Sequence, residues 1–187
     1  MPEQLQKFRE IVTLADGARI ILRPMIREDH DLLSELYSSI NDDDLRYFRH
    51  NVKDPNVLKE WSTNLDYGKV IPLLALVKDQ PVGNATLHFG EGPRRHIGEI
   101  RLFLKRDFRK RGLGMKMLKA IVDIGRRQGL HILIAEVIAE NVKLIKAFEN
   151  MGFEQQCALE DYFIFPDGEC ADVKLMVMPL KVKIDEY

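Results

Sequence analysis

The chain is poor in cysteine and tryptophan, with two of the former and one of the latter among 187 residues. A framework of several disulfide bridges or a cysteine-rich metal site therefore cannot organise this fold. The five histidines lack the close spacing of metal ligands, and no metal is predicted. Because 45% of the residues are hydrophobic, we expect a packed core and a single domain over residues 1–187, with its core at about 12–180.

Neither sign of charge is in excess, since 28 Lys and Arg residues stand against 29 Asp and Glu residues. Nucleic-acid-binding proteins usually carry a clear basic excess, so no nucleic-acid partner is predicted. Long apolar runs are also missing, and the longest, residues 70–77, is far too short to cross a bilayer. The first ten residues carry charges where a secretion signal needs an apolar segment. We therefore expect a cytoplasmic protein without a membrane partner.

The two cysteines, Cys157 and Cys170, fall in a predicted C-terminal hairpin that turns at residues 166–169. Pairing of Phe165 with Cys170 would set Cys157 opposite Met178, far along the strands from Cys170. The Cα atoms of a disulfide lie within about 7 Å of each other. No internal bridge is therefore predicted.

Apolar periodicity predicts strands and helices in alternation along most of the chain. Residues 1–16 are expected to be peripheral, and the three aspartates at 42–44 are expected to cap a short helix. A strand, a helix and a second strand between residues 97 and 138 require a parallel crossover, hence an α/β or α+β sandwich. Strands are expected at 18–25, 70–78, 82–89, 97–105, 130–138 and 173–180, and helices at 28–40, 45–49, 55–65, 112–128 and 141–151.

Residues 99–114 read EIRLFLKRDFRKRGLG, an apolar strand followed by a basic turn with glycines and the start of a helix. Gly112 and Gly114 let a ligand approach the backbone closely and leave its N–H groups unhindered. The positive end of the helix points at the same place. The segment therefore predicts a site for a phosphate-bearing ligand. A Walker loop is absent, and a dinucleotide fingerprint would place glycine or alanine where Met117 stands.

Two motifs, in this order, resemble the GNAT superfamily of acyl-CoA-dependent N-acyltransferases. The first is Arg/Gln-x-x-Gly-x-Gly/Ala between a strand and a helix, here residues 109–114. The second is an asparagine that opens the helix after the next strand, here Asn141, with an aromatic-x-x-x-Gly-Phe ending at 148–153. The segments DGARIILRPMIREDHDLL and DDDLRYFRH are similar to bacterial protein-lysine acetyltransferase domains. The resemblance implies an α/β (α+β) fold with a mixed, mostly antiparallel sheet of about six to seven strands and helices on both faces.

The resemblance also implies acetyl-CoA as co-substrate. Backbone N–H groups of the turn would hold the pyrophosphate, and Leu102 and Leu104 would pair with the pantetheine amides. Backbone donors near Leu104 would polarise the thioester carbonyl. Asn141 would contact the pantetheine arm, although it is also a good N-cap residue. The predicted cofactor-binding residues are Leu102, Phe103, Leu104, Arg109, Lys110, Arg111, Gly112, Leu113, Gly114, Met115 and Asn141.

Glu99 is the predicted catalytic base, because a carboxylate at this place in the strand resembles the base of protein-lysine acetyltransferase domains. The competing interpretation is a surface charge beside Arg101. Many family members carry a tyrosine that protonates the departing CoA thiolate, but Phe148 stands there. A thiol with a pKa of about 8.5 leaves readily, whereas a lysine amine with a pKa of about 10.4 must first lose a proton. The base therefore matters more than the missing acid, for which Tyr162 is a candidate substitute.

The predicted function is transfer of an acetyl group from acetyl-CoA to a primary amine, with a protein lysine as the preferred acceptor. One alternative is a small-molecule amine acetyltransferase, and another is a non-catalytic acyl-CoA-binding or sensing domain. A third is an interaction module with a vestigial site. The sequence leaves a homodimer open and specifies neither the acceptor nor the length of the acyl chain.

Overall fold

The computed structural model describes residue 5 and residues 7–180. Within this part of the chain, eight strands are hydrogen-bonded in the order β1-β2-β3-β4-β5-β6-β8-β7. The chain forms two compact units, here called unit 1 (residues up to Thr86 with Leu102–Met117) and unit 2 (Leu87–Arg101 and from Leu118 onward). Three elements contribute residues to both units: β4 (Gln80–Phe89), β5 (Ile97–Leu104) and α5 (Leu113–Arg127). The mixed, mostly antiparallel sheet that the sequence predicts is confirmed, and the single domain stays a prediction.

Unit 1 begins with a strand that the sequence analysis missed. Residues Glu10–Thr13 form β1, which pairs antiparallel with β2 (Arg19–Pro24). In turn, β2 pairs antiparallel with β3 (Val70–Val77). As the edge strand of the sheet, β1 lies at the periphery, as expected for the N-terminal segment, and only its Val12 is buried. Residues 1–4 and 6 of that segment lie outside the described residues.

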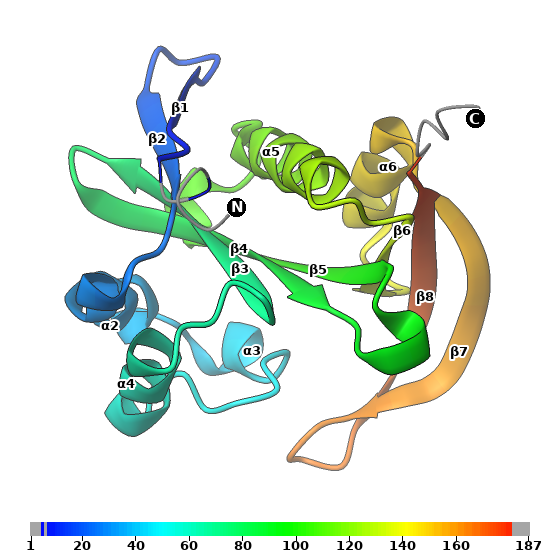
Figure 1. The fold of residues 1–187 in the computed structure, drawn as a ribbon. Coiled ribbons are helices and arrows are strands. Elements are labelled where there is room, and N and C mark those ends of the chain that lie inside the picture. The colour runs from blue at the N-terminus through cyan, green and yellow to red at the C-terminus, as the bar shows by residue number, and fades with distance from the viewer. Residues whose placement is uncertain (1–4, 6, 181–187) are drawn as a thin grey trace, which may run out of the picture. The chain divides into compact units, whose positions relative to one another are not determined.

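Two helices of unit 1, α2 (His30–Ser38) and α4 (Pro55–Thr63), share a hydrophobic core with β3. The side chains of Leu33, Leu36 and Leu58 are buried in it. Helical spacing of apolar residues therefore predicted both helices correctly, because that spacing produces the buried face. Figure 1 shows α2, α3 and α4 in the blue to cyan part of the chain.

The short helix α3 (Asp42–Leu45) begins and ends earlier than the predicted helix at 45–49, which was therefore wrong except at Leu45. Asn41 is its N-cap, with an extended backbone and a side chain that accepts a hydrogen bond from the Asp44 N–H at 2.8 Å. The aspartates expected to cap a helix at 45–49 instead form the first turn of α3, where negative charge is favourable. None of the residues of α3 is buried.

Unit 2 contains the predicted parallel crossover. Residues Ile97–Glu99 of β5 pair in parallel with Ile132–Ile134 of β6 (Ile132–Ile138), and α5 connects the strands. The pairs end at Glu99 and Ile134, although β6 continues its antiparallel ladder with β8 (Cys170–Pro179) to Ile138. Within unit 2 the two strands therefore stop pairing partway along their length.

The C-terminal hairpin joins β7 (Glu154–Ile164) to β8 in a register that departs from the expectation. Ile164, not Phe165, lies opposite Cys170, and Cys157 lies opposite Leu175. The prediction missed register shifts between Gln155 and Cys157 and between Leu159 and Phe163, where the ladder bulges. Both cysteines are free and exposed. No helix among the described residues has the length and apolar character to cross a membrane.

Candidate active site

Residues 109–114, here called the glycine turn, follow the short 3-10 helix η3 (Arg106–Phe108) after β5 and run into the first turn of α5 within unit 1. Lys110 and Gly112 have positive φ angles of 59° and 83°, which reverse the chain direction in a small space. Around Gly112 a Cβ atom would meet nothing within 4 Å, so the backbone is open to a ligand. The first N–H groups of α5 have no intrahelical partner. The turn therefore has the open, donor-rich backbone that an anionic group needs.

Glycines also determine how closely the end of β5 packs. A Cβ atom on Gly83 would lie 2.5 Å from the Leu104 side chain and 3.1 Å from the Phe103 carbonyl oxygen. On the helix side, a Cβ atom on Gly114 would lie 3.5 Å from the side chains of both Leu102 and Leu104. The side chains of Leu102 and Leu104 therefore pack on the face covered by the start of α5.

The Phe103 side chain lies on the other face of β5, in an aromatic cluster of unit 1. Its ring centroid is 5.2 Å from that of Tyr37 and 5.4 Å from that of Phe48. Leu113 is fully buried, and Met115 is partly buried. The side chains of Phe103 and Leu113 thus serve packing, so any ligand contact from these two residues would come from the backbone.

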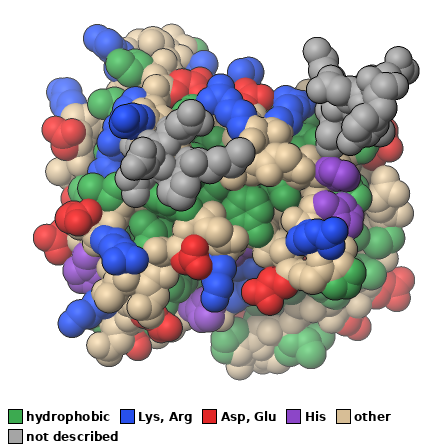
Figure 2. Space-filling model, in the orientation of Figure 1, with side chains coloured by type: hydrophobic (Ala, Val, Ile, Leu, Met, Phe, Trp, Pro, Cys, Tyr) green, Lys and Arg blue, Asp and Glu red, His purple; other side chains and the backbone are tan. Residues whose placement is uncertain are grey.

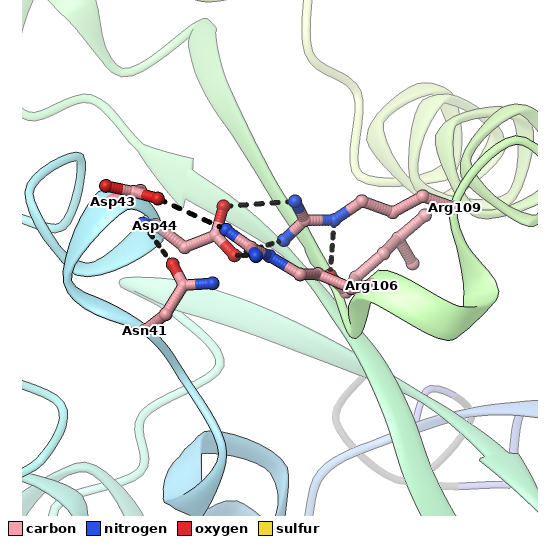
Figure 3. A network of polar contacts seen from close by, with 6 residues as sticks. Asn41, Asp43, Asp44, Arg106 and Arg109 are labelled. Atoms are coloured by element: carbon pink, nitrogen blue, oxygen red, sulfur yellow. Dashed lines mark hydrogen bonds and ion pairs between the residues drawn. The ribbon is translucent and has the colours of Figure 1, made fainter.

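Figure 3 shows that Arg109 points away from the glycine turn toward α3. Its Nη1 and Nη2 atoms donate to the two carboxylate oxygens of Asp44 at 3.0 and 2.8 Å. Its Nε atom donates to the Leu104 carbonyl oxygen at 2.9 Å. All three guanidinium nitrogens are therefore engaged, so the structure gives this arginine a structural contact that the sequence analysis did not foresee.

Arg111 is also paired. Its Nε atom donates to the Asp16 carboxylate at 2.7 Å, and its guanidinium lies 4.7 Å from the centroid of the Phe108 ring. Hydrogen bonds from the Ala18 backbone N–H and from Arg111 lower the pKa of Asp16. Lys110 is exposed and has no ion pair within the described part of the chain. Of the three basic residues in the turn, Lys110 is thus the one whose positive charge is not paired with an aspartate among the described residues and can interact with a ligand.

Glu99 lies in unit 2, at the last pair of the β5–β6 ladder. Its Oε1 atom accepts a hydrogen bond from the Arg101 Nε atom at 2.8 Å, and both side chains are partly exposed. The competing interpretation of Glu99, a charge beside Arg101, is thus correct about the contact. This contact does not test the predicted base role of Glu99, which stays a prediction.

Glu136 is a further carboxylate near Glu99 that was not predicted from the sequence. In the parallel ladder Glu99 is opposite Ile134, so their side chains share a face of the sheet, and Glu136 follows on that face two residues later. Its Oε1 atom accepts a hydrogen bond from the Tyr162 hydroxyl at 3.1 Å. The signal in the sequence was a single carboxylate within the apolar strand LHILIAEVI. Two carboxylates therefore lie on the same face of β5 and β6.

The two parts of the second motif form the beginning and the end of one helix, α6. Asn141 caps α6 (Val142–Met151), with its side chain accepting from the Leu144 N–H at 3.2 Å. Gly152 ends the helix with φ at 99°, and the Phe153 N–H donates to the Phe148 carbonyl at 3.0 Å. Phe148 is 3% exposed and packs edge-on against Phe153. The motif thus has a structural explanation, and a role of Asn141 toward a cofactor stays a prediction.

Among the described residues, no group of three or more His, Cys, Asp or Glu side chains is arranged to hold a metal ion. Figure 2 shows basic and acidic side chains interspersed over the displayed face, in keeping with the balanced charge of the chain.

Comparison with known proteins gives partial sequence matches to acetyltransferases. The chain is 29% identical over 76 residues to the [Ribosomal protein bS18]-alanine N-acetyltransferase of Escherichia coli K12, covering 41% of this chain and 51% of the relative. It is 34% identical over 56 residues to the L-methionine sulfoximine/L-methionine sulfone acetyltransferase of Pseudomonas aeruginosa PAO1, covering 30% and 33%. The chain thus spans about half the length, or less, of these curated relatives.

Solved structures share the fold over most of the chain. A ribosomal-protein-alanine N-acetyltransferase from Brucella melitensis matches with a TM-score of 0.75 at 23% identity, covering 85% of this chain and 99% of its own. The GNAT domain of S. lividans PAT matches with a TM-score of 0.74 at 21% identity, covering 92% and 97%. Salmonella typhimurium yncA, solved with its cofactor acetyl-CoA, matches with a TM-score of 0.76 at 18% identity, covering 90% and 98%. At these identities the likeness concerns the fold.

The sequence model of the acetyltransferase (GNAT) family matches residues 32–153, which is more than half of the chain and includes both the glycine turn and the Asn141 helix. The resemblance found in the sequence is confirmed, and this chain belongs to the acetyltransferase (GNAT) family.

Proposed function

We propose that this protein is an N-acetyltransferase that moves the acetyl group of acetyl-CoA to a primary amine, with a protein lysine as the preferred acceptor. The observation that carries the proposal is the glycine turn in a chain of this family. Its backbone is open at Gly112, and the exposed ammonium of Lys110 lies beside it. These groups fit a pyrophosphate, because backbone N–H groups at the positive end of a helix favour anions.

The strand next to the turn supplies the second part of the cofactor site. The side chains of Leu102 and Leu104 are packed against the start of α5, so the backbone of this segment is what a ligand can reach. A pantetheine arm carries amide groups that hydrogen-bond as a peptide strand does. Asn141, which caps α6 through its carbonyl oxygen, retains its amide nitrogen as a donor for this arm.

Acetyl transfer requires an uncharged amine. Glu99 would take a proton from the acceptor ammonium, directly or through a water molecule, and the free amine would attack the thioester carbonyl carbon. A C–N bond forms, the C–S bond breaks and the CoA thiolate leaves with the electron pair, while the nitrogen gives up its second proton to the solvent. Backbone N–H groups near Leu104 would stabilise the negative oxygen that develops on the carbonyl.

No side-chain acid is needed for the thiolate to leave. A thiol has a pKa of about 8.5, so its anion is a good leaving group near neutral pH. Phe148 is buried against Phe153 and carries no hydroxyl. The Tyr162 hydroxyl donates its hydrogen to Glu136, which makes this tyrosine a weak candidate for the acid.

A cationic acceptor is favoured by the two carboxylates, Glu99 and Glu136, that share one face of β5 and β6. Glu99 lies on β5 opposite Ile134, and Glu136 lies two residues further along the neighbouring strand β6. Both side chains are partly buried. Carboxylates there attract an ammonium group and position it for loss of a proton. Relatives named for acetylation of a ribosomal protein alanine and of methionine derivatives make protein α-amines and small amines the second class of acceptor to test.

The test is to incubate the protein with acetyl-CoA and a panel of lysine peptides, peptides with a free N-terminal alanine, polyamines and amino acids. Release of free thiol together with acetylation of an amine supports the proposal. Binding of acetyl-CoA without thiol release across the whole panel would point to a sensing domain instead.

Gly112 offers a matched pair of variants for the cofactor step. Gly112→Asp and Gly112→Asn place side chains of similar shape in the open space at φ 83°, and only the first adds a negative charge. We expect Gly112→Asp to abolish binding of acetyl-CoA and Gly112→Asn to weaken it far less. Equal binding by Gly112→Asp and the unmodified protein would exclude the turn as the pyrophosphate site.

A further inference from the structure

Two neighbouring aspartates of α3 have different surroundings. The Asp43 side chain is 89% exposed and has one long ion pair, to Arg106 at 3.5 Å. The Asp44 side chain is 19% exposed and receives three donors, two from Arg109 and one from the Arg106 Nε atom at 3.2 Å. Both of its oxygens are therefore engaged by guanidinium groups, as Figure 3 shows.

Arg109 connects three parts of unit 1 through one side chain. Its planar guanidinium contacts the Asp44 carboxylate on one edge and the Leu104 carbonyl on another. Arg109 is itself the first residue of the glycine turn, and Leu104 is the last residue of β5. The side chain thus fixes the turn relative to the end of the strand, and Asp44 fixes the side chain.

A bidentate carboxylate is a strong and geometrically specific partner for arginine. The hydrogen bonds orient the guanidinium plane, so that Nε faces the Leu104 carbonyl at 2.9 Å. Without Asp44, the Nη1 and Nη2 groups of Arg109 would face solvent or bind another anion. The hydrogen bond from Nε to the Leu104 carbonyl would then be less firmly oriented. The helix that carries Asp44 also packs its partly buried Leu45 against the core of unit 1, and the polar contacts join it to the turn in addition.

We infer that Asp44 is a positioning residue for the cofactor site. It does not touch acetyl-CoA; it holds Arg109, and through Arg109 the glycine turn and the carbonyl end of β5, in the arrangement that receives the ligand. The inference rests on the proposed use of acetyl-CoA. It assigns the carboxylate of α3 to affinity for the cofactor and not to the chemistry at the acceptor.

The experiment compares Asp44→Asn with Asp43→Asn, a control on the adjacent residue of the same helix. Acetyl-CoA binding is measured by calorimetry, and KM and kcat are measured with any acceptor found in the panel. Because a hydrogen bond to a charged group is lost, we expect Asp44→Asn to raise Kd and KM for acetyl-CoA about tenfold. The value of kcat at saturating acetyl-CoA should stay within about twofold, and Asp43→Asn should change neither.

Two further variants separate positioning from simple destabilisation. Asp44→Glu keeps a carboxylate that reaches the same guanidinium and should recover most of the affinity. Arg109→Gln should match Asp44→Asn, and the double variant should bind no more weakly than either single one, because both remove the same pair. Additive losses, or no recovery by Asp44→Glu, would overturn the inference.

A readout without ligand distinguishes this inference from the proposed function. Amide hydrogen exchange of residues 110–116 in the free protein should accelerate in Asp44→Asn and not in Asp43→Asn. If the unmodified protein binds no acetyl-CoA, the proposed function fails while the exchange result still decides whether Asp44 holds the turn. Tighter binding of acetyl-CoA by Asp44→Asn would show that Asp44 competes for Arg109 and would also overturn the inference.

Discussion

Arg101 donates from Nε to the Oε1 atom of Glu99 at 2.8 Å, two residues along the same strand. Side chains at this spacing point to the same face of β5, so the arginine orients the carboxylate on the face that also carries Glu136. Orientation of a base by a neighbouring side chain is a common arrangement in active sites.

Glu99→Gln should lower kcat most near pH 7 and least at high pH. The acceptor amine, with a pKa of about 10.4, loses its proton unaided as the pH rises, so the base is needed less. The measurement is kcat from pH 6.5 to pH 9.5 with one acceptor, with thiol release in the absence of acceptor as the control. An equal loss at every pH would remove the base role from Glu99.

Lys110→Gln should weaken binding of acetyl-CoA several-fold, whereas Arg111→Gln should have the smaller effect. Lys110 is exposed without an ion pair in the described part of the chain, while Arg111 is held by Asp16. An ammonium beside a phosphate gains from charge-assisted hydrogen bonding, and the gain falls with salt.

The measurement for Lys110 is Kd for acetyl-CoA at low and high ionic strength. Lys110→Arg serves as the control, because it keeps the charge at the same positive φ of 59°. A larger effect for Arg111→Gln than for Lys110→Gln would contradict the assignment of the free charge to Lys110.

Phe148→Tyr should not raise kcat and should reduce the free energy of unfolding by about 1–3 kcal/mol, because it places a hydroxyl in an apolar site. Phe148 is 3% exposed and packs against Phe153 with ring centroids 5.0 Å apart. Urea unfolding and steady-state kinetics measure the two effects. A gain in kcat would mean that protonation of the thiolate limits the reaction.

Tyr162→Phe should leave most of the turnover, because the Tyr162 hydrogen is donated to Glu136. A side chain that acts as general acid contributes about a hundredfold or more to the rate. The measurement is kcat at saturating concentrations of both substrates. A loss of that size would instead identify Tyr162 as the acid that protonates the departing thiolate.

The stabilising effect of Asp44 should disappear in acid. Burial of this carboxyl tends to raise its pKa, but hydrogen bonds and charges from Arg109 and Arg106 outweigh burial and lower the pKa below its ordinary value. The ion pair therefore stabilises the fold above the unfolded pKa of about 3.9, and the stabilisation is lost as the pH falls through the lower folded value.

The corresponding measurement is the difference in free energy of unfolding between the unmodified protein and Asp44→Asn, from pH 7 down to pH 2.5. The difference should be constant at neutral pH and shrink below about pH 4. A difference that persists in strong acid would mean that the shape of the side chain matters and not its charge.

Local signals in the sequence predicted the parts of the site that are themselves local. The glycine turn is six consecutive residues, and the Asn141 cap and the Gly152 end belong to a single helix. Their conformations follow from backbone preferences and hydrogen bonds within a few residues. These same features carried the family resemblance.

Contacts between distant residues could not be predicted in the same way. Asp44 and Arg109 are 65 positions apart, and Glu136 and Tyr162 are 26 apart. Nothing near Arg109 in the sequence indicates that its guanidinium faces a carboxylate and not a phosphate. The bulges of β7 likewise depend on pairing with β8, so the register of the hairpin was misjudged.

The early end of the β5–β6 ladder turns an interior position of the sheet into an edge. Beyond Glu99 and Ile134, the backbones of β5 and β6 in unit 2 no longer pair with each other through hydrogen bonds. β6 remains paired with β8. Unpaired strand edges invite association with other chains. A ligand that brings its own amide groups would close this edge, so the ligand-free protein should aggregate more readily on storage than the loaded one.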